Sequence, residues 1–138
     1  MIDFNEIIYI KSGNPKTILI NNELKEYIVA EVNVNLHKRD NKKILIDYCV
    51  NVDANTFDFF KTLNFRIYKV SENCTHEPIG SMRNIIISPT IANIQSFFLY
   101  DEEVCRDCFK YIAVAENTGT IGNGIAILNN SNLRVTIF

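Results

Sequence analysis

Apolar and polar residues alternate along much of this chain with a period of two. In the clearest segment, Ile28–His37, every second residue is apolar: Ile28, Ala30, Val32, Val34 and Leu36. A second alternating segment, Ile44–Asp53, follows the polar turn Lys38–Lys43. This period is that of a β-strand with one apolar and one wet face. Two such segments around a short polar turn predict a long antiparallel hairpin.

Shorter β-prone segments, separated by turn-forming residues, fill most of the rest of the chain. They are Glu6–Ile10, Thr17–Ile20, Leu63–Tyr68, Ile79–Ile87, Ile94–Tyr100, Phe109–Glu116, Ile125–Leu128 and Leu133–Phe138, the last two forming a hairpin around Asn129–Ser131. No segment has a helical period. The sequence therefore predicts an all-β protein, an antiparallel β-sandwich of nine or ten strands with the jelly roll as the favoured form. We expect one domain over residues 1–138.

Composition agrees with a globular domain and excludes several classes of function. The chain has 138 residues, 47% of them hydrophobic and 22% charged, enough for one sizeable core. Its net charge is −2 and its basic residues are scattered, which argues against a nucleic-acid partner. The apolar runs are far shorter than the roughly 20 residues of a membrane span. The N-terminus does not resemble a signal peptide, so we expect synthesis in the cytoplasm.

Four cysteines, Cys49, Cys74, Cys105 and Cys108, supply the main candidate chemistry. In an oxidising setting they could form disulfides. Alternatively, Cys74, His76, Cys105 and Cys108 together offer the thiolate and imidazole ligands of a tetrahedral zinc site. Cys49 falls on the wetter face of its predicted strand.

Catalysis has no support in the sequence, and we expect no enzyme activity and no cofactor other than that alternative zinc. The Cys105–Cys108 pair is followed by a β-prone segment, whereas a redox Cys-x-x-Cys opens a helix. Nucleophile motifs are absent. The acidic run Asp101–Glu103 is expected to be solvated. Phe97 and Phe98 should point to opposite faces of their strand, so that one ring could meet a neighbouring subunit.

The second half of the chain resembles a small uncharacterised family of cysteine-bearing β proteins from spore-forming clostridia. The resemblance rests on the order of these blocks: Leu63–Val70, Cys74, Pro78–Ser81, Ser96–Phe98, the Cys105–Cys108 cluster running into Tyr111–Val114, and the late ILNNSNLRVTI. Members of that family carry a further cysteine near the first strand, where this chain has Thr17–Asn22 without one. By analogy, the family is similar to jelly-roll subunits of endospore appendages and the exosporium.

The resemblance implies a structural subunit that assembles with copies of itself into a spore-surface or cell-surface filament or layer. Edge strands would pair, with residues 1–16 as an N-terminal arm and Ile7, Ile8, Tyr9 and Ile10 as its assembly residues. Intersubunit disulfides would lock the contacts. The alternative is a non-catalytic binding module built on the Cys/His zinc site.

Overall fold

The computed structural model describes residues 9–21, 25–34, 44–54, 60–87, 93–101, 108–121 and 125–137. Its secondary structure in these ranges is all strand: β1 Tyr9–Ser12, β2 Lys16–Ile20, β3 Glu26–Asn33, β4 Ile44–Ala54, β5 Phe60–Ser71, β6 His76–Ile87, β7 Asn93–Asp101, β8 Cys108–Ile121 and β9 Ala126–Ile137. Within these ranges there is no helix that could cross a bilayer.

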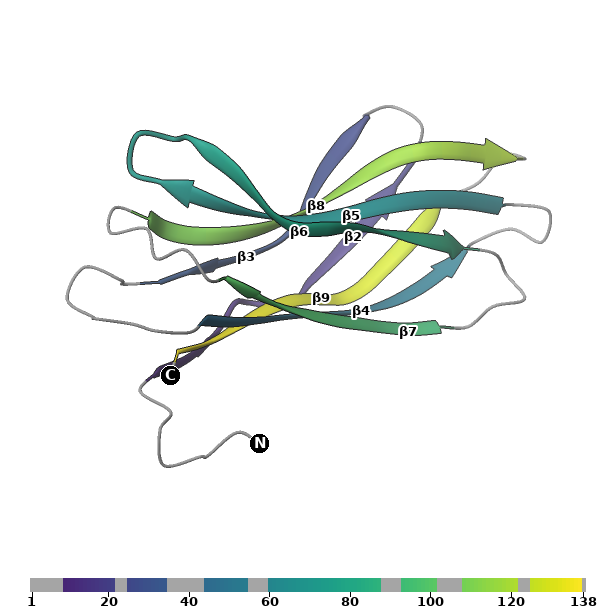
Figure 1. Ribbon diagram of the computed structural model, residues 1–138. Coiled ribbons are helices and arrows are strands. Elements are labelled where there is room, and N and C mark those ends of the chain that lie inside the picture. Colours follow the sequence, from purple (N-terminus) through teal and green to yellow (C-terminus); the bar gives the residue numbers. More distant parts are fainter. Residues whose placement is uncertain are drawn as a thin grey trace.

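The strands form two antiparallel sheets stacked face to face (Figure 1). Sheet A has the order β1-β9-β4-β7, with β2 also paired to β9, and sheet B has the order β3-β8-β5-β6. Most chain neighbours therefore lie in different sheets or are separated by another strand, which is the double Greek-key arrangement of a jelly roll. This confirms the predicted all-β sandwich.

The predicted hairpin between Ile28–His37 and Ile44–Asp53 is wrong. β3 pairs with β8 in sheet B, whereas β4 lies between β9 and β7 in sheet A. The period of two assigns each strand an inner and an outer face, and both strands do bury one face. It does not identify the pairing partner, because a jelly roll joins strands that are distant in sequence.

Two bulges also correct the strand assignments. In β3 the register shifts between Ile28 and Ala30, so that Val29 and Ala30 are both buried while Ile28 is exposed. The predicted C-terminal hairpin is instead the single strand β9. Its register against β4 shifts at Asn130, which has a φ of 53°. A bulge adds a residue to one strand without ending it, so its polar residues resemble a turn in the sequence.

The N-terminal strands complete sheet A by pairing with the C-terminal strand. Tyr9 lies opposite Ile137 and Ile10 opposite Thr136 in the β1–β9 register. Ile7 and Ile8 lie outside the described residues. If residues 1–16 serve as an arm for a neighbouring subunit, β1 must therefore leave β9 of its own chain.

The core fills the space between the two sheets and includes one polar connection across it. The Tyr48 ring packs against Phe65 and Phe97, with centroid distances of 5.5 and 5.3 Å. Its hydroxyl lies 2.7 Å from Oγ of Ser131, which donates a hydrogen bond of 2.7 Å to the carbonyl oxygen of Val29. Burial raises the pKa of Tyr48 well above its ordinary range. Ser131, in the β9 bulge, thus ties sheet A to β3 of sheet B.

Candidate functional site

An apolar row on the outer face of β7 is the most prominent surface feature of the described residues. Ile94, Phe98 and Tyr100 are 75%, 61% and 39% exposed, and Ser96 is exposed between them. The Phe98 and Tyr100 rings meet edge to face at 6.3 Å. Exposed apolar residues gathered on one strand, unlike scattered ones, are typical of an interaction surface.

The backbone of β7 forms an open end of sheet A. Among the described strands it pairs with β4 alone, in nine successive residue pairs without a register shift, from Ile44 with Asp101 to Val52 with Asn93. β7 contains no proline and no lysine, and its one charged residue is Asp101 at its end. Natural proteins usually protect such an edge with bulges, prolines or charges. β7 has none of these devices along its exposed row.

The edge strand β6 of sheet B does carry such protection. Pro78 lies within it, and Gly80 has a left-handed φ of 68°. Between the Phe65–Arg83 and Ile67–Ile79 pairs the register shifts, leaving extra residues on β6. A bulge of this kind bends the edge and interrupts the row of backbone groups that another strand could use.

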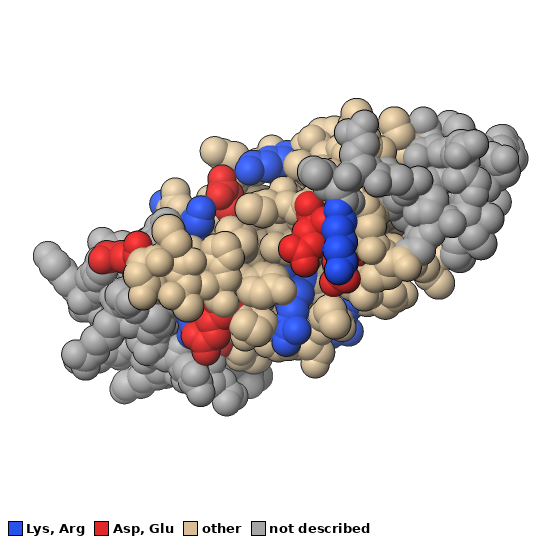
Figure 2. Space-filling view, turned by 90° about the horizontal axis from the view of Figure 1, so that it is seen from above, with Lys and Arg blue, Asp and Glu red and all other residues tan. Residues whose placement is uncertain are grey.

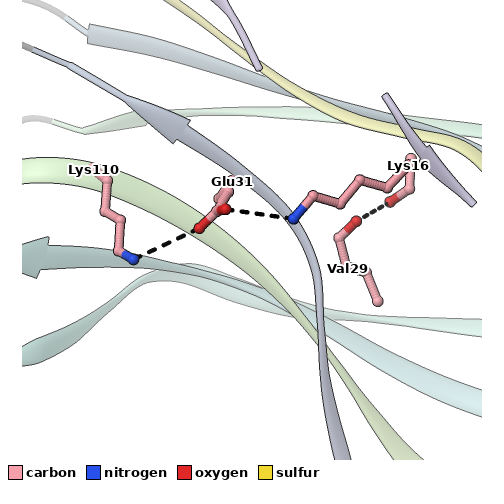
Figure 3. Close-up of polar contacts among 5 residues, drawn as sticks. Lys16, Val29, Glu31 and Lys110 are labelled. Carbon is pink, nitrogen blue, oxygen red and sulfur yellow. Dashed lines mark hydrogen bonds and ion pairs between the residues drawn. The ribbon is translucent and has the colours of Figure 1, made fainter. Parts of the chain in front are cut away.

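The opposite side of the sandwich is protected by charges and breaks. Glu31 of β3 lies 3.4 Å from Nζ of Lys16 in β2 and 3.6 Å from Nζ of Lys110 in β8 (Figure 3). These side chains are partly exposed, so the pairs contribute little stability. Gly13 interrupts the edge between β1 and β2, where its amide donates to the carbonyl of Leu133. The register of β2 against β9 is also irregular.

The face of sheet B seen in Figure 2 shows basic and acidic side chains interspersed. The described residues on this face form no field of a single sign, and so they do not make the clustered positive charge that a nucleic-acid surface requires. The apolar row on β7 is a different kind of surface.

The inner face of β7 is firmly packed against β6 and the core. A Cβ added to Gly80 would lie 3.1 Å from Cδ2 of Leu99, so the absence of a side chain there lets β6 approach β7 closely. The Arg83 guanidinium lies 5.8 Å from the centroid of the Phe97 ring. As the Phe97-Phe98 pattern predicts, one ring points inward and the other outward.

A buried ion pair anchors the last residue of β7. Nζ of Lys69, in β5, donates to both carboxylate oxygens of Asp101 at 2.9 and 3.1 Å, and both side chains are almost fully buried. The hydroxyl of Tyr111, in β8, donates to the same carboxylate at 2.8 Å. Burial, and next the charge of Asp101, raises the pKa of Tyr111 well above its ordinary range. The expectation that Asp101 is solvated is therefore wrong, because its position faces the core.

A hollow of about 320 Å³ lies beside this ion pair, between the start of β6 and the end of β7. Its lining comprises Lys69, Glu77, Pro78, Ile79, Gly80, Tyr100 and Asp101. The Lys69 ammonium is already engaged with both oxygens of Asp101, which gives the pair a structural role in connecting the sheets. The hollow thus continues the β7 surface toward sheet B.

Sequence reasoning missed Lys69 and Tyr111. A signal for Lys69 was present, because it follows Leu63, Phe65 and Ile67 at the same spacing of two and so falls on the inner face of its strand. A lysine at such a position needs a buried anionic partner, and Asp101 supplies it.

The structure brings the backbones of three predicted cysteine and histidine ligands to one end of sheet B. The amide of Cys74 donates to the carbonyl of Ser71 at 2.9 Å, Ser71 lies opposite Cys108, and His76 lies opposite Val70. Cys74 is exposed and free, with a φ of 63°, a region that favours glycine. Cys105 and the side chain of Cys108 lie outside the described part. Both the disulfide and the zinc assignments stay predictions.

Cys49 is far from that end, in the middle of the outer face of sheet A. It is exposed and free, and it lines a hollow of about 240 Å³ with Ser12, Asp47, Asn132 and Arg134. Arg134 and Asp47 form an ion pair of 3.3 Å there. Within the described ranges no three Cys, His, Asp or Glu side chains gather as metal ligands.

Solved structures with the same fold include viral capsid proteins. The structure of infectious bursal disease virus, Gt strain, aligns with a TM-score of 0.68 at 11% identity, over 96% of this chain and 33% of that chain. A VP2 subviral particle of the same virus aligns with a TM-score of 0.63 at 14% identity, over 94% and 32%. At this identity the likeness shows the fold alone, and this chain spans about a third of the length of those proteins.

Sequence comparison identifies the family. No curated protein matches the chain. A family model described as a domain of unknown function, DUF4489, matches residues 7–136. An uncharacterised family is what the resemblance predicted, and the chain belongs to the DUF4489 family.

Proposed function

We propose that this protein is a non-enzymatic structural subunit that assembles with copies of itself through the edge of its β-sandwich. The observation that carries the proposal is the unprotected edge of β7 with its exposed row Ile94, Phe98 and Tyr100. An edge of this kind can extend its sheet with a strand from another chain, since backbone hydrogen bonds supply affinity and the side chains supply register.

The apolar row provides a moderate driving force. Covering the exposed parts of Ile94, Phe98 and Tyr100 on two copies would contribute roughly 7 kcal/mol, at about 2 kcal/mol for each fully buried side chain. Association itself costs roughly 4–15 kcal/mol. The contact therefore depends on protein concentration and on the added backbone hydrogen bonds, which suits a subunit that polymerises where it accumulates.

Other observations are compatible with this proposal. The similar viral structures include T=1 particles and a VP2 subviral particle, so chains that contain this fold form assemblies in that virus. In the proposed filament or layer, disulfides from Cys74, Cys105 and Cys108 would lock contacts between subunits, each adding about 2–4 kcal/mol. The family resemblance supports a spore or cell surface as the setting.

A second candidate function is a zinc-binding module. The observation in its favour is that Cys74, His76 and Cys108 lie at one end of sheet B. Metal analysis of protein purified under reducing conditions tests it. One zinc per chain in the native protein, and none in a variant in which Cys74 is substituted, would support zinc binding in place of cross-linking.

Negative-stain electron microscopy over a range of protein concentrations tests the assembly, with gels run with and without reductant. We expect filaments or sheets, and a ladder of covalent oligomers that collapses on reduction. Phe98→Lys should abolish assembly because it places a charge in the apolar row. Met82→Lys is the matched control, since Met82 is 51% exposed on the protected strand β6. Monodisperse monomers of the native protein at every concentration would contradict the proposal.

A further inference from the structure

We infer that β7 pairs with β7 of a second copy of this chain, around a two-fold axis perpendicular to sheet A. This inference rests on the proposed self-assembly and names the surface that meets β7. Because a two-fold pair closes on itself, the proposed intersubunit disulfides would supply the second contact that extends pairs into a filament or layer. Two copies would then share one continuous sheet, with the apolar row of each strand placed against the same row of its partner.

The contrast among the edges of the sandwich supports this pairing. β6 is bulged around Gly80, β3 is bulged after Ile28 and flanked by charges, and the β1–β2 edge is broken at Gly13. Apart from the four-residue strand β1, whose edge ends at the break at Gly13, β7 is the only described edge strand that runs without a register shift against its neighbour. Because the other edges are protected against strand addition, the best partner for β7 is another β7.

Two-fold symmetry makes the pairing self-complementary. Such an axis reverses the strand direction, so the two β7 strands are antiparallel, the arrangement that already holds throughout sheet A. It also places the outer faces of both copies on the same side of the shared sheet. Directly opposed residues share a face, so the outward residues Ile94, Ser96, Phe98 and Tyr100 meet one another and no outward residue meets a core position.

The charge pattern of β7 favours contact with itself. Its exposed row carries no charge, so two copies can meet without like-charge repulsion. Asp101 at the end of the strand is buried and bound to Lys69. At the β3 edge, Glu31 forms ion pairs with two lysines. Pairing this edge with β7 would desolvate these charged groups without offering them a charged partner, which is unfavourable.

A charge-exchange experiment at Ser96 tests the inference. Ser96 is exposed in the middle of the row. With the two-fold axis at the middle of β7, Ser96 lies close to its own counterpart. Ser96→Lys and Ser96→Glu should each weaken the association of the full-length protein, measured by sedimentation equilibrium under reducing conditions. In a mixture of the two variants, the association constant should be about tenfold higher than for either variant alone, since unlike charges then face each other. Ser81→Lys and Ser81→Glu, at an exposed serine of β6, are the matched controls and should leave association unchanged.

The outcomes separate this inference from the proposed function. Weak association of each Ser96 variant, with recovery in the mixture, supports two-fold pairing of β7. If the native protein associates but the mixture shows no recovery, β7 meets a different surface, such as the N-terminal arm of a neighbour, and the inference is wrong while self-assembly stands. If the native protein stays monomeric throughout, both are wrong.

Discussion

The buried pair of Lys69 and Asp101 gives a quantitative test of how the two sheets are held together. Asp101→Asn leaves the Lys69 ammonium buried without its counter-charge, although a side-chain oxygen remains for the hydroxyl of Tyr111. Breaking a buried pair by removing one charge costs about 3–5 kcal/mol. For 138 residues the entropy of unfolding is about 0.3 kcal/mol/K, so the Tm should fall by about 10–17 °C.

A double-mutant cycle isolates the interaction. Lys69→Met alone leaves a buried carboxylate and should also be strongly destabilising, whereas the double variant with Asp101→Asn contains neither charge. We therefore expect the double variant to be more stable than Asp101→Asn alone, with a coupling energy of about 2 kcal/mol or more.

Chemical denaturation followed by circular dichroism supplies the free energies of unfolding. A parallel cycle on the exposed pair Asp47–Arg134 should give less than about 1 kcal/mol. Additive effects of Lys69→Met and Asp101→Asn would refute the reasoning, because they would mean that each group is solvated independently of the other.

Three further predictions concern other parts of the fold. Ser131→Ala should cost about 1–3 kcal/mol in urea denaturation, because it removes the buried hydrogen bond to Val29. Burial raises the pKa of Tyr111, so the folded state keeps a proton that the unfolded chain releases above pH 10. Its contribution to stability is therefore complete below pH 10 and declines by about 1.4 kcal/mol per pH unit above it, and Tyr111→Phe should remove this part of the slope in alkaline denaturation. Gly13→Ala would place a Cβ 2.1 Å from the carbonyl oxygen of Glu31, and should lower the free energy of unfolding by about 1–3 kcal/mol. If a variant has the same denaturation midpoint as the native protein, the contact that it alters does not stabilise the fold as argued.

The sequence predicted the strands well because each strand buries one face. Ile44, Ile46, Tyr48, Val50 and Val52 are all buried, as their spacing of two requires. The pairing of strands was not predictable in the same way. The partner of β4 is decided by how two whole sheets stack, and the neighbouring polar turn suggested a hairpin that the stacked sheets do not contain.

The candidate site was predictable only in part. The sequence predicted that Phe97 and Phe98 point to opposite faces, but it did not identify which ring is outward. That β7 is an edge strand depends on the sheet order and could not be seen in the sequence. Asp101 was assigned to a charged loop because Glu102 and Glu103 follow it. Its burial depends on Lys69, which is 32 residues away in the chain and meets it only when the two sheets are stacked.

The position of β9 has a consequence for the order in which the molecule can fold. β9 lies between β1 and β4, so the first and last described strands are neighbours in sheet A. During synthesis, β4 and β7 leave the ribosome before the strand that covers their other side exists. The nascent chain then exposes two edges of β4–β7 in place of one, and sheet A closes only when β9 arrives. A chaperone that covers the free edge of β4 during this interval would therefore raise the yield of folded protein, and it would do so without changing the stability of the finished domain.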